Sequence, residues 1–271
     1  MATKEQPKIK LYWLNDSRSQ NTLWLLEELN LQYETEVFRR APNMLAPPEL
    51  AKAHPLGKAP ILEITPVSRA GEEQQQPITL AESGYITQYL VDHFGQNKPS
   101  LVPQRWKEGR EGEVGGETVA FARFQYLLHY VEGSFFSNLV QYLLISALKS
   151  NNVPFLVRPI TSLVANKIFS LVVLPDAKKH LALLDSFLKT APGTTDGDGY
   201  LCGPELSAAD VLISFGITLA DQMGAYDAMG SWEGGSSRAA YPVLFAYVDR
   251  LKKEPGYIRA REKAKEIEGR K

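Results

Sequence analysis

The side chains that most often carry chemistry are few and widely spaced in this sequence. There is one cysteine, Cys202, which excludes an intramolecular disulfide, a Cys-x-x-Cys redox pair and a multi-cysteine metal site. The four histidines, at positions 54, 93, 129 and 180, show neither HxxxH nor HExxH spacing. The sequence therefore predicts no metal centre and no redox-active cysteine pair.

Two polar stretches lie where helices are expected to begin. Ser17 and Ser19, in NDSRSQ, follow a β-rich run, and both residues are good helix caps. Ser83, in ESG, stands at the start of an amphipathic helix, where unpaired N–H groups and the helix dipole favour an anion. Pro60 directly precedes the β-rich ILEIT, and a proline at such a position ordinarily just starts a strand.

The first hundred residues alternate between strand and helix patterns. Strands are predicted over 8–14, 32–38, 60–65 and 77–80, and helices over 22–31, 48–53 and 81–95. The resulting order is β-α-β-α-β-β-α. The polar segment VSRAGEEQQQ, between the last two strands, is expected to form a loose hairpin loop.

From residue 98 onward the strand patterns disappear. Helices are predicted over 106–148 with a kink near Gly133, and over 155–172, 175–190, 207–223 and 241–265 with a break at Pro255. The glycine-rich EGREGEVGGE (108–117) lacks the strand-to-helix context of a phosphate loop and is interpreted as a solvated helix face. The predicted domains are therefore 1–97 and an all-helical 98–271, an α+β chain.

Composition describes a globular protein with little overall charge. Apolar residues make up 44% and charged residues 23%, and the formal net charge is −1, which argues against a basic footprint for nucleic acid. No uninterrupted apolar run reaches the length of a membrane span, and the polar N-terminus does not resemble a secretory signal. A cytosolic location is expected; membrane association of the helix around 155–174 is left open.

Four separated motifs, in order, resemble one known family. GKAPIL before the third strand, LAESGYITQYL after the fourth, YVEGS, and LSAADVLI in the helical half together resemble the cytosolic glutathione S-transferases, and SRSQNTLWLLEELNL is most similar to their fungal Gtt1-like branch. The resemblance covers nearly the whole chain. It implies a thioredoxin-like first domain with a mixed four-stranded sheet, followed by a helical bundle.

The resemblance implies how glutathione would be held. The Ala59–Pro60 bond would be cis, which leaves the backbone N–H and C=O of Ala59 free to pair with the cysteinyl residue of glutathione. Ser83 would receive the γ-glutamyl carboxylate and Glu82 the ammonium group. The candidates for the glycyl carboxylate are Lys52, Lys58 and Arg40.

The chemistry that the resemblance implies requires a thiolate. Ser17 is the first choice as the hydroxyl that donates to the sulfur, with Ser19 and Arg18 as alternatives and Asn15 as a further one. The loop contains neither the cysteine nor the tyrosine of other classes, although Tyr12 on the first strand could approach. Cys202 is expected to be a passive packing residue.

In LSAADVLI, Ser207 and Asp210 have the spacing of a capping box, a structural role. The electrophile site should be apolar and lie where the domains meet, and aromatic side chains are its candidate walls. These are Trp13, Tyr126, Tyr130, Phe135 and Phe136.

The sequence therefore predicts a glutathione transferase that joins the sulfur of glutathione to small hydrophobic electrophiles, a detoxifying reaction. Reduction of hydroperoxides, a protection against oxidative stress, is the expected side activity. We expect glutathione to be a co-substrate and the protein to form a homodimer. We expect no metal or organic cofactor and no nucleic-acid partner. The alternative is a non-catalytic glutathione-binding regulatory or carrier module, because a fold does not fix a function.

Overall fold

The computed structural model describes residues 5–68 and 71–269, which form two compact units. The first unit holds the residues up to Leu101 together with those from Lys252 onward, and the second holds Val102–Leu251. The predicted boundary after residue 97 assigned everything that follows to the helical domain. In the structure the C-terminal segment instead packs with the first unit, through contacts described below.

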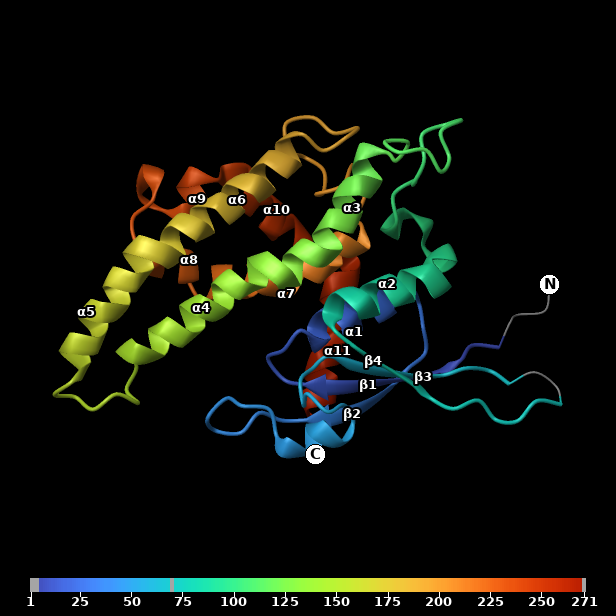
Figure 1. Cartoon of the computed structure of the whole chain (residues 1–271), viewed down its shortest axis with the longest axis horizontal. Helices are drawn as coiled ribbons and strands as arrows, with labels where there is room; N and C mark the ends of the chain where they lie inside the picture. Colours follow the sequence, from blue (N-terminus) through green and yellow to red (C-terminus); the bar gives the residue numbers. More distant parts are fainter. Residues whose placement is uncertain (1–4, 69–70, 270–271) are drawn as a thin grey trace. The chain divides into compact units, whose positions relative to one another are not determined.

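The first unit contains a four-stranded mixed sheet (Figure 1). Its elements are β1 (Lys8–Leu14), α1 (Ser19–Glu28), β2 (Glu34–Phe38), the 3-10 helix η1 (Pro48–Lys52), β3 (Ile61–Thr65), β4 (Ile78–Ala81), α2 (Ser83–Phe94), the short 3-10 turns η2 (Gly95–Asn97) and η3 (Pro99–Leu101), and α11 (Pro255–Gly269). The strand order is β2-β1-β3-β4, with β1 and β2 parallel and the other pairs antiparallel. The predicted thioredoxin-like arrangement is confirmed.

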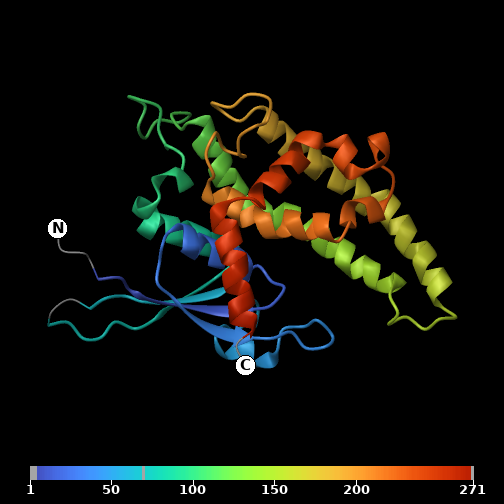
Figure 2. The ribbon, with the colours of Figure 1, turned by 180° about the vertical axis from the view of Figure 1, so that it is seen from behind.

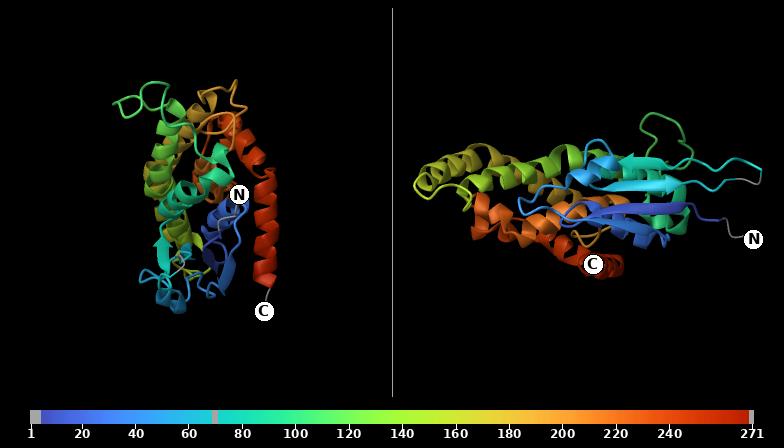
Figure 3. Two further views of the ribbon diagram at one scale, coloured as in Figure 1. Left: turned by 90° about the vertical axis from the view of Figure 1, so that its right-hand side faces the viewer. Right: turned by 90° about the horizontal axis from the view of Figure 1, so that it is seen from below.

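The C-terminal helix α11 packs against α1, and it runs alongside the sheet of this unit (Figures 2 and 3). The ring of Tyr257 meets Trp24 edge-on at 5.2 Å, and Arg261 donates to the side chain of Gln20 at 3.0 Å. Gly256 lies so close to Trp24 and Glu28 that a Cβ atom there would overlap both side chains. Glycine is thus required where α11 crosses α1.

The second unit consists of helices. They are α3 (Val119–Tyr130), α4 (Phe136–Ser146), α5 (Arg158–Ile168), α6 (Leu174–Lys189), α7 (Ala208–Gln222), α8 (Ala225–Met229), α9 (Ser237–Ala240) and α10 (Pro242–Leu251), with the 3-10 turns η5 (Ala147–Lys149) and η7 (Glu233–Gly235). Two π-helical turns, η4 (Val131–Phe135) and η6 (Phe169–Val173), join α3 to α4 and α5 to α6. The irregularity predicted near Gly133 is the first of these.

The predicted start of the first long helix at residue 106 was wrong. Residues 105–118 form a loop that is closed by a bridge between Trp106 and Glu117, and the helix begins only at Val119. Gly109, Gly112 and Gly115 adopt positive φ angles of 70°, 80° and 76°, which a helix does not contain. EGREGEVGGE is therefore a series of turns and not a solvated helix face.

The capping box predicted at the start of α7 is confirmed. Asp210 is fully buried, and its carboxylate accepts hydrogen bonds from the N–H and Oγ of Ser207 (2.9 and 2.6 Å), the N–H of Leu201 (3.1 Å) and the hydroxyl of Tyr247 (2.8 Å). Burial raises the pKa of this carboxyl, although the hydrogen bonds oppose the shift. One side chain thus joins the loop before α7, the start of α7 and α10.

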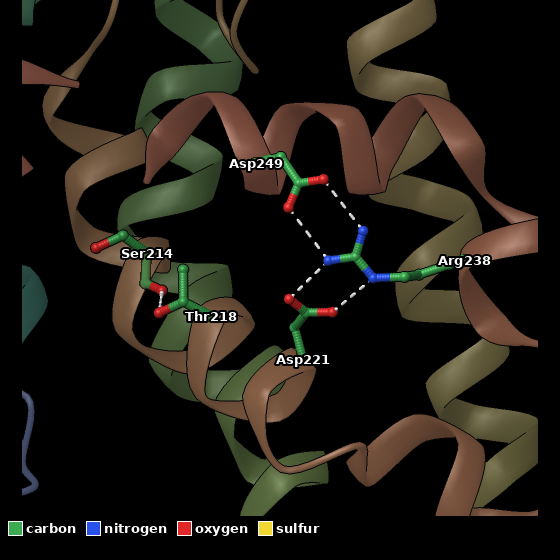
Figure 4. A network of polar contacts seen from close by, with 5 residues as sticks. All are labelled: Ser214, Thr218, Asp221, Arg238 and Asp249. Atoms are coloured by element: carbon green, nitrogen blue, oxygen red, sulfur yellow. Dashed lines mark hydrogen bonds and ion pairs between the residues drawn. The ribbon is translucent and has the colours of Figure 1, made fainter. Parts of the chain in front are cut away.

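A second polar cluster links α9 to α7 and α10 (Figure 4). The guanidinium of Arg238 lies between two carboxylates, with contacts of 2.9 and 3.0 Å to Asp221 and of 3.1 and 3.2 Å to Asp249. These hydrogen bonds raise the pKa of Arg238. Asp249 is half-exposed, so solvent weakens its share of this network.

The helical run Arg158–Lys189 is long and apolar enough, by length and composition, to cross a membrane. No uninterrupted apolar run reveals it, because basic and polar residues are spread along it.

Candidate functional site

The sheet brings four of the predicted segments to one of its ends. Tyr12 pairs with Ile61, Leu14 with Phe38, and Ile61 with Ala81. The segments that follow β1, β2 and β4 and the segment that precedes β3 therefore all leave the sheet at this end. In strand order they contain Arg40, the loop 15–18, Ala59–Pro60 and Glu82–Ser83.

The third-strand segment has the expected backbone. The Ala59–Pro60 peptide is cis, and both residues are buried, with Ala59 in a cluster that includes Tyr12, Leu14 and Leu50. No residue in the described part of the chain hydrogen-bonds to the backbone of Ala59. A polar edge at this point is thus available to a bound molecule.

The fourth-strand segment contains a buried hydroxyl that lacks a partner. Ser83 is 2% exposed, it is the first residue of α2, and within the described residues nothing hydrogen-bonds to its Oγ. Glu82 before it has φ 69° and ψ 118°, an uncommon conformation for a residue with a side chain, and its carboxylate is exposed. A buried hydroxyl beside the free N–H groups of a helix is suited to bind a carboxylate.

The hydroxyls of Ser17 and Ser19 are hydrogen-bonded within the protein. The hydroxyl of Ser17 lies 2.7 Å from the carbonyl oxygen of Leu14, to which it donates, and it accepts from the N–H of Ser19 at 3.1 Å. Ser19 is fully buried, with its Oγ 3.0 Å from that of Ser17. Arg18, the residue before α1, is half-buried. To donate to a sulfur atom, Ser17 must give up its bond to Leu14.

Arg40, predicted as a candidate for the glycyl carboxylate, is hydrogen-bonded to the protein itself. Its guanidinium donates to three backbone carbonyls, those of Asn15 (3.1 Å), Asp16 (3.1 Å) and Met44 (2.8 Å), and its own N–H donates to the Asn15 side chain at 2.7 Å. The pKa of Arg40 is lowered, mainly because the guanidinium is desolvated. The nearby Asp16 opposes this shift and Arg18 adds to it. Two of its five N–H groups therefore fix the loop after β1, and a third binds the segment after β2, which makes Arg40 a positioning residue.

The remaining predicted polar residues of the first unit divide into two kinds. Lys52 and Lys58 are exposed, and among the described residues neither has an ion-pair partner. Tyr12, in contrast, is buried and donates to Glu63 at 3.0 Å. Burial, and then Glu63, raise the pKa of Tyr12. The hydroxyl of Tyr12 is therefore bound to the neighbouring strand β3.

The aromatic residues predicted as walls of the electrophile site do not share one environment. Trp13 is fully buried in the core of the first unit and has no open surface to offer. In the helical unit, the ring of Tyr126 stacks on that of Tyr130 with 5.2 Å between the ring centroids. The ring centroid of Phe135 lies 6.2 Å from that of Tyr130. Phe136 instead packs on Phe215. Three of the predicted residues thus form one cluster.

This aromatic cluster has polar partners that the sequence reading missed. The hydroxyl of Tyr130 lies 2.7 Å from Nδ1 of His180, whose Nε2 is 3.3 Å from Asp176. Burial first, and then Tyr126, Tyr226 and Asp176, raise the pKa of Tyr130. The spacing of Asp176 and His180, four residues apart on a predicted helix, was the signal that could have revealed the pair.

Comparisons with known proteins agree with this arrangement. Residues 17–93 match the family model described as the N-terminal domain of glutathione S-transferase. Glutathione S-transferase 1 of Saccharomyces cerevisiae is 30% identical over 96% of this chain and 97% of its own, and glutathione S-transferase 3 of Schizosaccharomyces pombe is 28% identical over 79% and 75%. A glutathione transferase of Phanerochaete chrysosporium, solved with oxidised glutathione, has the same fold, with a TM-score of 0.62, 16% identity and complete coverage of both chains.

The similarity to the Saccharomyces protein extends over both units and nearly the full length of the two chains. It confirms the predicted enzyme class and the fungal Gtt1-like branch. This chain therefore belongs to the glutathione S-transferase family.

Proposed function

We propose that the protein binds glutathione across the end of the sheet described above and joins its sulfur to small hydrophobic electrophiles. The observation that carries the proposal is the buried hydroxyl of Ser83, which has no partner among the described residues and stands at the start of α2, just after the strand that pairs with β3. The open backbone of Ala59 lies just before β3. Adjacent strands lie about 4.8 Å apart, so β4 to β1 spans about 10 Å, roughly the length of an extended tripeptide.

The order of the segments gives each part of glutathione a partner. The γ-glutamyl carboxylate would accept from Ser83 and the first N–H groups of α2, and the cysteinyl backbone would pair with Ala59. The thiol then faces the loop 15–18 at the start of α1, where the helix dipole and Arg18 favour an anion. Lys52 and Lys58 are the cations proposed for the glycyl carboxylate.

The reaction follows from stabilising the thiolate. The thiol loses its proton to solvent, the sulfur forms a bond to an electrophilic carbon, and the leaving group departs with the bonding electrons. The same thiolate would reduce an organic hydroperoxide to an alcohol, with a second glutathione completing the disulfide and water released. Tyr126, 47% exposed, is the member of the aromatic cluster proposed to contact the apolar electrophile, with the buried Tyr130 and Phe135 packed behind it. A homodimer and a cytosolic location remain part of this proposal.

The binding mode is tested with Ser83→Ala and the matched variant Thr87→Val, which removes a buried hydroxyl one turn further along α2. A hydrogen bond to a charged group contributes about 1.5–3 kcal/mol, so Ser83→Ala should weaken glutathione binding about 10-fold or more. Thr87→Val should bind like the unchanged protein. Equal affinities in calorimetry for all three proteins would refute the proposed site.

The thiolate donor is tested with Ser17→Ala, Ser19→Ala and Arg18→Gln, by titrating the absorbance of bound thiolate and measuring conjugation of a chlorinated dinitrobenzene. The donor's variant should raise the pKa of bound glutathione by about one unit, which corresponds to about 1.4 kcal/mol. Thermal unfolding midpoints separate this effect from a loss of stability caused by removing the bond between Ser17 Oγ and the N–H of Ser19 at the start of α1. Tight binding without turnover on electrophiles and peroxides would favour the carrier module instead.

A further inference from the structure

The first unit contains a hollow at the end of the sheet that lies opposite the proposed glutathione site. Lys8 begins β1, Glu34 begins β2 and Thr65 ends β3, and all three line the hollow. Figure 1 shows this end of the sheet, where the chain enters β1 and leaves β3. The hollow measures about 560 Å³, and small-molecule sites typically measure about 300–1,000 Å³.

The hollow lies on one face of the sheet. Side chains alternate between the two faces along a strand, and Ile9, between Lys8 and Lys10, is buried. Lys8 and Lys10 therefore lie on the face opposite to that of Ile9. There Lys8 stands across from Thr65 of β3, and Lys10 stands across from Glu34 of β2. The floor of the hollow is thus a polar part of the sheet.

The same face is covered towards the proposed glutathione site. Tyr12 and Leu14, further along β1, pack in one cluster with Leu50 of η1. Lys10 lies at the border, with its ammonium group 4.8 Å from the ring centre of Tyr12. The covered part of the face is therefore apolar, and the part that forms the hollow is polar.

One wall of the hollow is fixed by a pair of hydrogen bonds. The side-chain amide of Gln6 donates to the carbonyl of Gln32 at 2.7 Å and accepts from the N–H of the same residue at 3.0 Å. These bonds join the segment before β1 to the segment before β2, as strand pairing would. The protein therefore holds this wall in place by itself.

The lining contains four charged side chains, and two of them are bound within the sheet. Lys10 forms an ion pair with Glu36 at 2.7 Å. Glu63 accepts a hydrogen bond from the hydroxyl of Tyr12 at 3.0 Å. Lys10 and Glu63 therefore contribute to the floor of the hollow.

The other two charged side chains of the lining are available to a ligand. Lys8 and Glu34 are exposed, and within the described residues neither has an ion-pair or hydrogen-bond partner. The hydroxyl of Thr65, across from Lys8, likewise has no partner among them. Lys8 lies two residues and one strand away from Glu34, since Lys10 is the partner of Glu34. With about 3.3 Å per residue and about 4.8 Å between strands, the Cα atoms of Lys8 and Glu34 lie about 8 Å apart.

Charge and spacing indicate the class of ligand. The two available groups have opposite signs, so the hollow complements a molecule with one carboxylate and one ammonium group. An extended chain spans about 3.5 Å per residue, and two residues therefore span about 7 Å. A dipeptide thus matches the spacing of Lys8 and Glu34, whereas a free amino acid is half as long.

We propose that this hollow binds dipeptides in an extended conformation, with the terminal carboxylate on Lys8 and Thr65 and the terminal ammonium group on Glu34. The dipeptide site and the proposed glutathione site lie at opposite ends of the sheet, so one molecule does not occupy both. Dipeptide binding does not depend on the proposed conjugation, and a failure of either proposal leaves the other standing.

The test is a titration of the full-length, isotope-labelled protein with glycylglycine in low-salt buffer, followed by the amide NMR signals. We expect the signals of Lys8, Glu34 and Thr65 to shift. Two analogues test the charges, because acetylglycylglycine lacks the ammonium group and glycylglycinamide lacks the carboxylate. Each analogue should bind about 5-fold more weakly, since an ion pair at the surface contributes up to about 1 kcal/mol. Added salt should weaken the binding of glycylglycine.

Substitutions assign each charge of the ligand to a side chain. Lys8→Gln should remove the preference for glycylglycine over its amide, and Glu34→Gln should remove the preference over the acetylated form. Lys179→Gln and Glu262→Gln, which change exposed charges outside the hollow, are the matched controls and should keep both preferences. Ser83→Ala should bind glycylglycine unchanged, which separates this site from the proposed glutathione site.

Three results would overturn the proposal. The first is that glycylglycine shifts no signal from the hollow. The second is equal affinity for glycylglycine and both analogues, or preferences that persist in Lys8→Gln and Glu34→Gln. The third is a shift of the signals of Glu82 and Ser83 in place of those from the hollow, which would put the dipeptide at the proposed glutathione site and leave that site standing.

Discussion

Replacing Asp210 by alanine should strongly lower the free energy of unfolding of the helical unit. The proposed contacts to glutathione should not change. The carboxylate is fully buried and accepts from four donors on three segments of the chain. Of these donors, the hydroxyl of Ser207 can rotate to a new acceptor. The N–H groups of Leu201 and Ser207 and the hydroxyl of Tyr247 would lose their partner.

The magnitude follows from those three groups. Each buried donor left without a partner costs about 1–3 kcal/mol, which gives a total of about 3–9 kcal/mol. Against this, the variant no longer has to desolvate a carboxyl, the same effect that raises the pKa of Asp210. Breaking a buried charged network by removing one member typically costs about 3–5 kcal/mol, and we expect a loss of that size.

The assay is urea unfolding followed by far-ultraviolet circular dichroism, with glutathione affinity measured separately under native conditions. Asp210→Asn keeps one acceptor oxygen and should fall between the alanine variant and the unchanged protein. Asp249→Ala removes a half-exposed carboxylate from Arg238 and should cost under about 1 kcal/mol. If Asp210→Ala cost no more than Asp249→Ala, the interpretation of Asp210 as the central acceptor of the helical unit would be wrong.

Three further predictions concern the first unit and the single thiol. Arg40→Lys replaces the planar guanidinium, which spans three carbonyls, by a compact ammonium group, so calorimetry should show about 10-fold weaker glutathione binding; unchanged affinity would mean that the loop after β1 is held by other contacts. Gly256→Ala places a methyl group against Trp24 and Glu28 and should lower the stability of the first unit by about 1–3 kcal/mol in thermal unfolding, whereas Gly95→Ala, whose nearest neighbour is 3.9 Å away, should not. Burial, and then Asp210, raise the pKa of Cys202, so the native thiol should not react with a disulfide reagent up to about pH 9 and should react at once in guanidinium; rapid native labelling would contradict this.

The sequence was most informative where structure depends on neighbours in the chain. The capping box of Ser207 and Asp210 depends on residues within one helical turn, so spacing alone predicts it. The loop at 105–118 was missed because helical periodicity was extended through Gly109, Gly112 and Gly115, although glycine is a poor helix former.

Other features depend on contacts that spacing does not contain. Arg40 reaches Asn15 because β2 lies parallel to β1, and only that pairing turns a candidate ligand contact into a brace for the loop. The hydroxyl of Ser17 has two possible uses, and its bond to Leu14 depends on how the chain turns after β1. Similarly, periodicity identifies α5 as apolar, but which of its sides is covered depends on the packing of the other helices.

The placement of α11 has a consequence for how the molecule is made. The surface of α1 that Tyr257 and Gly256 cover is synthesised before the helical unit, whereas α11, which covers it, is synthesised after that unit. On the ribosome, the indole of Trp24 therefore stays uncovered until α11 emerges, after the residues of the helical unit have been added. Nascent chains that stop before residue 255 should accordingly be recognised by chaperones that bind exposed apolar surface.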